Sequence, residues 1–571
     1  MIEFTDNNTP YAPLFDDIYF NKYDGLAETK HVFLAGNNLP NAWDHLETIT
    51  VIETGFGTGL NFLATWSLFE QNQKPNQKLH FISVEKHPLS TSDISKSLSR
   101  WDKDLGTYTK QLIDFYPIRI PGFHKIRFGD TVELLLIFED VHDALPKIET
   151  QADFWFLDGF SPSKNPDMWT QDLFDQMSHL SHDQTHLASF TAAGHVRRDL
   201  EKAGFNVKKA EGFNKKRDMT VARFGKDIKR KTPATPPKKI SIIGAGLAGC
   251  AVASVLRSYN VQVTLFEKGD DVASGASGNA LGLINPKLGS TGSVMQDYHA
   301  SAFAMAHRSF KTLEFFNQCG SLHVAHTDRR REKFDKFLKK SAWQSDHAHR
   351  VEAQDTKEFC GVEIDHGGIF LPESGCISPK NLCQHYAQDI DIRLNTEVKS
   401  NDLKQDENIT LIANANSAIQ FLEGLYLQPI KGQVGYIDAS LPLKSNLCFG
   451  GYMSPAVEGL HCLGASFHRG VDDTQYSSED FEGILEKLNT VLPSPILVKP
   501  KNEWVGVRCA SKDKLPITGQ WSDNLYTTIA HGSHGIISSL LSAHILGYRF
   551  GFGIQPVGTH ILNGLDPERF K

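Results

Sequence analysis

Three glycines and an acid in the middle of the chain have the spacing of a dinucleotide-binding site. Gly244, Gly246 and Gly249 lie between a β-type run and a helix-like run. Such glycines permit a tight turn, bring the backbone close to a pyrophosphate and let the helix pack on the strand. Glu267 ends the next predicted strand, where a carboxylate can accept hydrogen bonds from a ribose. We predict a bound dinucleotide here; a tight βα turn without a ligand is the alternative.

A second glycine pattern, nearer the N-terminus, has a different form. Glu53, Gly55, Gly57 and Gly59 spell E-x-G-x-G-x-G between a β-rich run and the start of a helix. This form is similar to the first loop of class I S-adenosylmethionine (SAM) methyltransferases, whose glycines let the backbone pass close to the methionine part of the cofactor. The resemblance implies that the N-terminal region binds SAM through these residues.

Three further acids follow predicted strands of the same region. Glu85 can hold both hydroxyls of a ribose, and Asp130 follows a third strand, where adenine-facing polar groups are usual. Asp158 follows a fourth strand, and the carboxyl ends of the strands form the ligand-binding edge of an open α/β sheet. The order of these features favours a methyltransferase site. A solvated acid is the alternative for Glu85 or Asp130 taken alone.

The elements that must position these residues divide the chain into two α/β domains. A chain of 571 residues is too long for one hydrophobic core. Residues 225–238 contain three prolines, several basic residues and no apolar periodicity, which is typical of a linker. We therefore predict a first domain over residues 1–225, a linker over 226–238 and a second domain over 239–571.

The composition argues against several classes of protein. All eight cysteines lie from Cys250 onward without a C-x-x-C pair, and no H-E-x-x-H occurs, so we expect neither a metal site nor disulfides. The N-terminal residues show no secretory signal and no run is apolar enough to span a bilayer, so we expect a cytoplasmic protein. The net charge of −8 gives no indication of nucleic-acid binding, which would depend on local basic patches.

The second domain continues with a segment rich in small residues. Residues 276–286 read ASGNALGLINP, which suits a backbone that passes under a ring system. The residues that we predict to lie against the cofactor in this segment are Ser277, Gly278, Asn279 and Gly282.

Two late segments carry the remaining predictions for this domain. Arg508 precedes a D-x-x-P-x-x-G turn at residues 513–519. Residues 531–536, with Gly532 and Gly535, open a predicted helix whose N-terminus can face the pyrimidine of a flavin. Together with the central glycine turn, these segments resemble the flavoprotein family of D-amino-acid, glycine and sarcosine oxidases. The resemblance implies FAD as the cofactor and a bidentate pair between Arg508 and a substrate carboxylate; a salt bridge of Arg508 within the protein is the alternative.

Longer motifs extend the resemblance over almost the whole chain. They are ETGFGTGLNF (53–62), FLDGFSPSKNPDMW (156–169), FTAAGHVRRDLEKAGF (190–205), KKRDM (215–219), GAGLAG (244–249) and RCASKDKLPITG (508–519). With both halves in this order, the chain is identified as a member of the bacterial family of bifunctional tRNA 5-methylaminomethyl-2-thiouridine biosynthesis proteins. The resemblance implies an α/β fold class: a class I, Rossmann-like methyltransferase domain, then an FAD-binding Rossmann domain with an α+β substrate domain of the D-amino-acid oxidase type.

The resemblance also implies two successive reactions on the wobble uridine of tRNA. The C-terminal domain would use FAD to remove the carboxymethyl group of 5-carboxymethylaminomethyl-(2-thio)uridine, which leaves 5-aminomethyl-(2-thio)uridine. The N-terminal domain would methylate that amine with SAM and form 5-methylaminomethyl-(2-thio)uridine. The first substrate is an N-substituted glycine, whose carboxylate suits Arg508.

Asp158 is the residue that we expect to position the amine for methylation. A carboxylate of pKa ~4 is a poor match for an ammonium of pKa ~10, so we assign Asp158 to positioning before proton removal. Capping of the following helix is the alternative role of Asp158.

Two other functions are open from the residues alone. A sarcosine-type oxidase fused to a methyltransferase of small metabolites would use Arg508 in the same way. A tRNA-binding scaffold would keep both nucleotide sites without turnover. The candidate phosphate contacts are Arg197–Arg198, Lys215–Arg217 and Arg329–Arg331.

Overall fold

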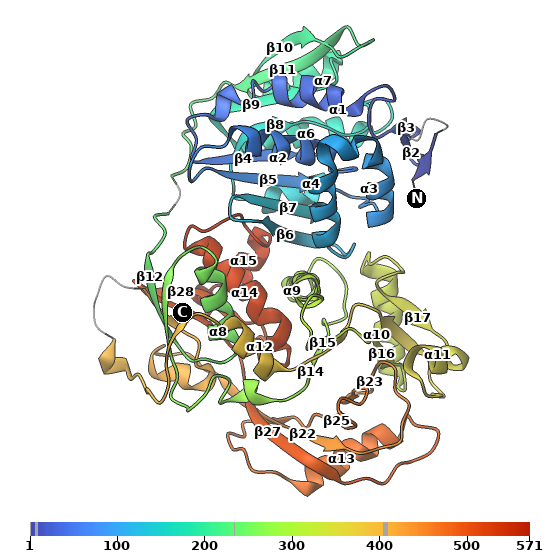
Figure 1. The fold of residues 1–571 in the computed structure, drawn as a ribbon, viewed down its shortest axis with the longest axis vertical. Helices are drawn as coiled ribbons and strands as arrows, with labels where there is room; N and C mark the ends of the chain where they lie inside the picture. The colour runs from blue at the N-terminus through green and yellow to red at the C-terminus, as the bar shows by residue number, and fades with distance from the viewer. Residues whose placement is uncertain (1, 6–8, 233, 404–408) are drawn as a thin grey trace. The chain divides into compact units, whose positions relative to one another are not determined.

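The computed structural model describes residues 2–5, 9–232, 234–403 and 409–571 (Figure 1). These residues form two compact units. The first unit comprises Met1–Ala234 and Gly553–Thr559, and the second comprises Thr235–Phe552 and His560–Lys571. The predicted linker, 226–238, spans the change from the first unit to the second, apart from Pro233, which lies outside the described residues.

A mostly parallel sheet forms the centre of the first unit (Figure 1). Its strand order is β10-β11-β9-β8-β4-β5-β7-β6. The strands are β4 (Thr48–Glu53), β5 (Lys78–Val84), β6 (Gly122–Phe128), β7 (Val132–Phe138), β8 (Ala152–Phe156), β9 (Ser181–Ser189), β10 (Phe205–Glu211) and β11 (Asp218–Phe224). Strands β7, β5, β4, β8 and β9 run parallel, so their carboxyl ends lie at one edge of the sheet.

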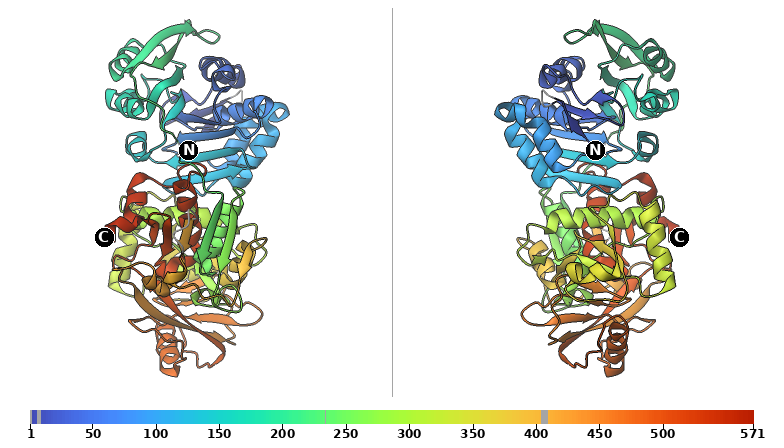
Figure 2. Two further views of the ribbon diagram at one scale, coloured as in Figure 1. Left: turned by 90° about the vertical axis from the view of Figure 1, so that its left-hand side faces the viewer. Right: turned by 90° about the vertical axis from the view of Figure 1, so that its right-hand side faces the viewer.

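Two hydrophobic cores cover the two faces of this sheet. Because successive side chains of a strand point to opposite faces, Val51 lies in one core and its neighbour Ile52 lies in the other. Helices α2, α3 and α4 contribute to the first core, and α5, α6 and α7 to the second. Helices lie on both sides of the sheet (Figure 2). The bounds are α2 (Leu60–Asn72), α3 (Thr91–Leu98), α4 (Asp102–Phe115), α5 (Val141–Ala144), α6 (Gln171–His179) and α7 (Gly194–Ala203).

Shorter elements complete the first unit. Near the N-terminus lie the strands β1 (Glu3–Phe4), β2 (Pro10–Ala12) and β3 (Asp17–Ile18) and the helix α1 (Gly25–Thr29). The segment Gly553–Thr559 places Ile554 in the second core, where its backbone N–H donates to Oε2 of Glu133 at 2.6 Å.

The expected placement of Asp130 at the ligand-binding edge is wrong. Strand β6 pairs antiparallel with β7 through a short hairpin, so Asp130 follows β6 at the edge where β5 and β7 begin. Its side chain is 84% exposed and forms an ion pair with Arg127 at 2.9 Å. The third strand that does reach the ligand-binding edge is β7, which Glu139 and Asp140 follow.

A parallel sheet of the second unit begins with the central glycine turn. Its strand order is β20-β13-β12-β21-β29-β28, and only β28 pairs antiparallel within this sheet of the described chain. The strands are β12 (Lys239–Ile243), β13 (Gln262–Phe266), β20 (Asp391–Arg393), β21 (Ile409–Ile412), β28 (Ile517–Ser522) and β29 (Leu525–Ile529). Helix α14 (Gly535–Arg549) packs on α8 (Leu247–Arg257) and on α9 (Val294–Phe310), and α12 (Pro379–Tyr386) also packs on α8.

A second, largely antiparallel sheet carries the arginine predicted to bind substrate. Strand β27 (Pro500–Ala510) pairs antiparallel along β22 (Gln428–Ile437), and α13 (Ser478–Asn489) packs on this sheet. The other strands are β16 (Ser321–Val324), β17 (His349–Val351), β18 (Gly368–Leu371), β23 (Asn446–Cys448), β24 (Tyr452–Met453), β25 (His461–Gly464) and β26 (His468–Arg469). The remaining elements are β14 (Gly282–Ile284), β15 (Phe316–Asn317), β19 (Gly375–Ile377), α10 (Asp328–Lys340), α11 (Thr356–Cys360) and α15 (Thr559–Leu565). The predicted α/β fold class is confirmed.

Within the described ranges, no helix combines the length and the apolar character needed to cross a membrane. The same ranges contain no cluster of three or more histidine, cysteine or acidic side chains arranged to hold a metal ion.

Candidate active sites

A large cavity opens at the carboxyl edge of the first unit's sheet. Its volume is about 1040 Å³, and Gly55, Gly57, Glu85 and Asp158 all line it. These residues follow β4, β5 and β8, which lie side by side in the sheet. The structure therefore brings together four of the residues that the sequence predicts for a SAM site.

The glycine turn after β4 is closed against Glu85. The backbone N–H of Gly57 donates to Oε2 of Glu85 at 2.9 Å, and the N–H of His87 donates to Oε1 at 2.7 Å. Gly57 has φ +51°, a conformation that side chains rarely adopt. Both oxygens of the Glu85 carboxylate are thus held in place by backbone, and each keeps a lone pair for a hydroxyl group.

Gly59 and Glu53 lie behind the cavity rather than on its wall. Gly59 has φ +82° and immediately precedes helix α2. A side chain there would meet the ring of Phe56 at 2.8 Å, so a glycine is needed for packing. Glu53 is 0% exposed at the end of β4. The contact of Gly59 and Glu53 with a cofactor stays a prediction. Their positions at the start of α2 and at the buried end of β4 are seen in the structure.

A hydrogen-bonded network connects Asp158 to buried Glu53. The Asn61 amide donates to Oδ2 of Asp158 at 2.7 Å and to Oε1 of Glu53 at 2.8 Å. The Thr29 hydroxyl donates to Oδ1 of Asn61 at 2.7 Å, and the Ser83 hydroxyl donates to Oε2 of Glu53 at 2.6 Å. Sequence reasoning assigned no role to Asn61, Thr29 or Ser83, because they come together only in the fold.

Burial changes the acidity of both carboxyl groups in this network. It raises the pKa of Glu53 to about 8 and the pKa of Asp158 to about 7. The Gly159 N–H, which donates to Oδ1 of Asp158 at 2.8 Å, and Asn61 oppose the shift at Asp158. Asp158 therefore has the acidity of a group that can exchange a proton at neutral pH. It caps no helix of the described chain, which removes that alternative role.

Aromatic rings and lysines form the outer part of the cavity wall. Phe160 stacks on Phe15 with ring centroids 4.6 Å apart. Tyr23 is 60% exposed, and the ammonium groups of Lys22 and Lys215 lie 5.2 and 5.7 Å from its ring centroid. Exposed rings flanked by cations are the groups that stack unpaired bases and contact phosphates.

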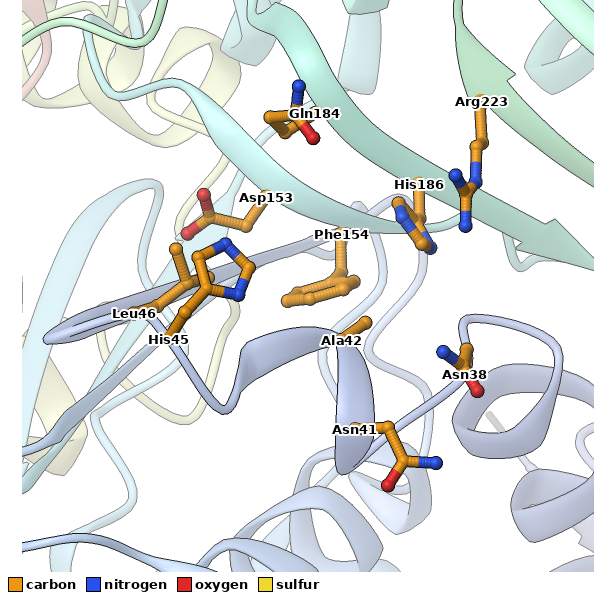
Figure 3. Close-up of a pocket in the computed structure, with 10 residues that line it drawn as sticks. All are labelled: Asn38, Asn41, Ala42, His45, Leu46, Asp153, Phe154, Gln184, His186 and Arg223. Carbon is orange, nitrogen blue, oxygen red and sulfur yellow. The ribbon is translucent and has the colours of Figure 1, made fainter.

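A second, smaller cavity lies at the opposite edge of the same sheet. Its volume is about 200 Å³ (Figure 3). The polar residues that line it are Asn38, Asn41, His45, Asp153, Gln184, His186 and Arg223. Asp153 lies at the start of β8, whereas Asp158 follows the end of that strand, so this cavity contains none of the predicted site residues.

The central glycine turn has the geometry that its pattern predicts. Gly244 has φ +105° between β12 and α8. A side chain on Gly249 would overlap the carbonyl oxygen of Gly244, so this glycine sets the close packing of helix on strand. Among the described residues, only the Ser277 hydroxyl, at 3.2 Å, would lie close to a side chain on Gly246. Glu267 accepts from the N–H of Ala245 at 2.8 Å, which fixes its carboxylate beside the turn.

The segment of small residues lies next to this turn. The Ser277 hydroxyl accepts from the N–H of Leu247, at the first turn of α8, at 3.0 Å. Asn279 accepts from the Tyr436 hydroxyl at 2.6 Å, and Gly278 lies between these two residues. Gly282 begins β14, and a side chain there would overlap Ile536.

The start of α14 leaves open space beside its backbone. Gly532 has φ +57°, and no atom of the described residues lies within 4 Å of the position that a side chain would take. Gly535 is the first residue of the helix. Gly246 and Gly532 thus leave room that a side chain would fill, which fits a bound FAD. The contacts of these glycines with FAD stay predictions.

Arg508 lies on β27 with its guanidinium over the backbone of β22. It forms no ion pair with any carboxylate of the described residues, which removes the salt-bridge alternative. Burial lowers the pKa of Arg508, and Tyr452 opposes this shift. A side chain on Gly432 would overlap the guanidinium, so Gly432 makes the space that Arg508 occupies. Sequence reasoning missed Gly432, because the register of β22 on β27 is not visible in the sequence.

The basic residues predicted to contact phosphates differ in whether their side chains are free to reach a ligand. Arg330 points inward: its guanidinium donates to the carbonyl oxygens of Val324 at 2.7 Å and Cys448 at 3.1 Å. Lys215, by contrast, lines the large cavity. Arg330 therefore serves packing, and the loop between β10 and β11 is the better candidate surface.

Sequence models of two enzyme families match the two halves of the chain. A sequence model of the FAD dependent oxidoreductase family matches residues 239–549, and one of the S-adenosyl-L-methionine-dependent methyltransferases matches residues 103–224. Among solved structures, glycine oxidase from Bacillus cereus is 20% identical with a TM-score of 0.49, and the match covers 57% of this chain and 99% of that one.

Full-length relatives share both halves in the same order. The tRNA 5-methylaminomethyl-2-thiouridine biosynthesis bifunctional protein of Methylobacillus flagellatus is 32% identical over 98% of this chain and 94% of the relative. The protein of the same name from Stutzerimonas stutzeri is 31% identical over 100% of this chain and 96% of the relative. The chain therefore belongs to this bifunctional family, with a SAM-dependent methyltransferase in its first half and an FAD-dependent oxidoreductase in its second.

Proposed function

We propose that the chain performs two successive steps on the wobble uridine in the anticodon loop of tRNA. The FAD-dependent half removes the carboxymethyl group of 5-carboxymethylaminomethyl-(2-thio)uridine, and the SAM-dependent half methylates the resulting 5-aminomethyl group. The observation that carries the proposal is Arg508, a half-buried residue whose guanidinium forms no ion pair with a carboxylate of the described residues. The family to which the chain belongs supports the same pair of steps.

The oxidative step needs a carboxylate clamp and an oriented α-carbon. The substrate group is –CH2–NH–CH2–COO⁻, and the guanidinium of Arg508 binds its carboxylate through two hydrogen bonds. Bound FAD would supply the acceptor for the hydride that leaves the α-carbon. Loss of the nitrogen's proton completes an imine, which water hydrolyses to glyoxylate and the primary amine. No acid–base pair is essential if the amine binds in its neutral form.

The methylation step needs a neutral amine in line with the methyl group of SAM. The amine loses a proton before or during its attack, and Asp158 is the acid on the cavity wall whose pKa lies at about 7. This acidity lets Asp158 accept a proton as well as position the amine, a wider role than the sequence alone suggested. Proton transfer to Asp158 leaves the amine lone pair free for the methyl group.

The partner that fits the outer cavity wall is single-stranded RNA. Tyr23 is 60% exposed and can offer its ring to a base, and the ammonium groups of Lys22 and Lys215 lie within 6 Å of that ring, where they can contact phosphates. An anticodon loop presents splayed bases of this kind. A tRNA substrate also fits the cytoplasm as the place of action.

Mass spectrometry of tRNA nucleosides tests the proposal. Purified protein with FAD and SAM should convert carboxymethylaminomethyluridine in tRNA to methylaminomethyluridine. Arg508→Ala should block the first step and still methylate a tRNA that already carries the aminomethyl group. Asp158→Ala should accumulate the aminomethyl intermediate.

The same assay separates the alternative functions. Turnover of free sarcosine-type substrates with no change in tRNA would favour a small-molecule enzyme. Binding of tRNA without any product would favour a scaffold. Loss of both steps in folded Arg508→Ala protein would contradict the division of labour between the two halves.

A further inference from the structure

We propose that Asn61 is the positioning residue of methyl transfer: its amide fixes the Asp158 carboxylate at the cavity wall and favours its ionised form, while complete burial leaves Glu53 as the neutral partner. The inference rests on the proposed methylation at Asp158 and adds a residue to that site. It is carried by the hydrogen bonds that connect Thr29, Asn61, Glu53 and Asp158.

The orientation of the Asn61 amide is determined by its three partners. Its nitrogen faces two carboxyl oxygens, at 2.7 Å in Asp158 and 2.8 Å in Glu53, and only the donor end of the amide satisfies both. Its oxygen faces the Thr29 hydroxyl at 2.7 Å, which donates to it. Every strong donor of this amide is used inside the network. Although Asn61 lines the cavity, it therefore acts on the substrate through Asp158.

The backbone of α2 places Asn61 between the two acids. It is the second residue of α2, directly after the left-handed turn at Gly59. The first turn of a helix carries a partial positive charge, which favours an anion beside it. Asn61 and Thr29 are 8% and 4% exposed, so water offers little substitute for their hydrogen bonds.

Glu53 has the surroundings of a neutral carboxyl group. It is 0% exposed, its partners are the amide of Asn61 and the hydroxyl of Ser83, and no cation of the described chain forms an ion pair with it. Two ionised carboxylates sharing one amide repel each other, so one of them keeps its proton. Asp158 borders the cavity and Glu53 does not, so the charge belongs on Asp158.

Charged groups on neighbouring elements do not change the assignment of the negative charge to Asp158. Glu28, from α1, raises the pKa of Asp158, and Lys216, from the loop between β10 and β11, lowers it. These two side chains form an ion pair with each other at 3.2 Å, so their effects largely offset. Asn61 then remains the side-chain donor that favours ionised Asp158.

Steady-state methylation of aminomethyl tRNA over a range of pH tests the inference. Asn61→Leu keeps the approximate volume of the side chain and removes its hydrogen bonds. At pH 7 we expect kcat to fall about 10- to 100-fold, while the KM for SAM stays within about 2-fold. Because a lost donor disfavours the anion, the rise of kcat with pH should also move to higher pH.

Two substitutions of Thr29 test the same network with a smaller expected loss of kcat, and one of the two retains the hydroxyl. Thr29→Val keeps the shape and removes the hydroxyl, so the amide loses its orientation and kcat should fall about 3- to 10-fold. Thr29→Ser keeps the hydroxyl and should behave as the wild type. Asn72→Leu, at the exposed end of the same helix, is the matched control and should leave kcat unchanged.

The outcomes distinguish this inference from the proposed function. If the wild type methylates the amine and both Asn61→Leu and Thr29→Val match it in kcat and in pH profile, the role of Asn61 is refuted while the function stands. An Asn61→Leu enzyme that loses SAM affinity as much as kcat would also refute the role of Asn61. The same holds if Thr29→Val and Thr29→Ser have the same kcat. A wild type that transfers no methyl group would overturn both.

Discussion

At the residue scale, the acidity of Asp158 connects the structure to a measurable rate. Burial raises its pKa to about 7, so the carboxyl group is protonated at lower pH and ionised at higher pH. Only the ionised form can accept a proton from the amine. The local surroundings thus make Asp158 a group that titrates near neutral pH.

We expect methyl transfer to lose rate as the pH falls below about 7, with the slope of a single protonation. Single-turnover transfer from SAM to aminomethyl tRNA measures this profile. Asp158→Asn should lower the rate about 10²- to 10⁴-fold and abolish the dependence at this pH. A profile unchanged by Asp158→Asn would assign the titrating group elsewhere.

Residue types at strand ends were predictable, and their partners were not. Glu85 and Asp158 follow strands that the sequence marks clearly, so their place on the cavity wall could be expected. Asn61 looks like any polar residue at a helix start, and Thr29 lies 32 residues before it. Their hydrogen bond depends on the packing of α1 beside α2, which periodicity does not encode.

At the element scale, the pairing of β22 with β27 positions the arginine of the oxidative site. The register sets Ile430 opposite Arg508, and Gly432 opposite Gly506, two residue pairs further along. The guanidinium lies over Gly432, where any side chain would overlap it. A substitution on β22 can therefore displace the guanidinium that β27 carries.

Gly432→Ala should displace the guanidinium without unfolding the sheet, because the long side chain of Arg508 can move. We expect the KM for the carboxymethylaminomethyl substrate to rise about 10-fold or more, with the FAD content unchanged. Oxidation kinetics with tRNA and the visible absorbance of the protein measure the two quantities. Gly483→Ala, on α13 with no atom within 4 Å, is the control. An unchanged KM would place Arg508 outside the substrate contact.

The contact of α8 with β12 gives a second prediction at this scale. A methyl group on Gly249 would overlap the carbonyl oxygen of Gly244, which is backbone and cannot turn aside. Gly249→Ala should therefore push α8 off the strand and reduce the FAD bound per chain severalfold, which flavin absorbance measures. Gly547→Ala, whose new methyl group would lie 3.5 Å from Val255, should retain FAD. Full FAD content in Gly249→Ala would contradict this role for the glycine.

Strand direction explains the wrong placement of Asp130. The run that ends at Phe128 looks like any other strand in the sequence, but it turns back in a hairpin and pairs antiparallel with β7. A hairpin reverses which edge the end of a strand reaches, and the G-D pair at residues 129–130 is a turn signal as well as a site signal. The glycine patterns predict the position of a site more reliably than a single acid does, because their spacing specifies a strand followed by a helix.

At the scale of the whole molecule, the first unit is not continuous in the sequence. Gly553–Thr559 belongs to it, and Ile554 is 1% exposed in one of its cores. Gln555 is fully buried and accepts from the N–H of Glu149 at 2.9 Å. No local pattern in residues 553–559 indicates this membership, because the contacts join positions about 400 residues apart.

Ile554→Ala should destabilise the first unit by about 2–4 kcal/mol, since it removes buried methyl groups from a packed core. Calorimetry with and without SAM identifies the transition of the first unit, because SAM stabilises it. Flavin content should stay at the wild-type value. Ile419→Ala, which removes a 55% exposed side chain, is the control. An unchanged SAM-sensitive transition would show that Ile554 contributes little.

Because residues 553–559 belong to the first unit, that unit can be completed only late in synthesis of the chain. A ribosome releases the chain from the N-terminus at ~5–20 residues per second, so residues 553–559 emerge on the order of tens of seconds after residue 234. Until then the nascent methyltransferase lacks part of its core. An mRNA truncated in the oxidoreductase region before the codon of Gly553 would thus yield an incomplete methyltransferase as well, and quality control by proteolysis would remove both activities together.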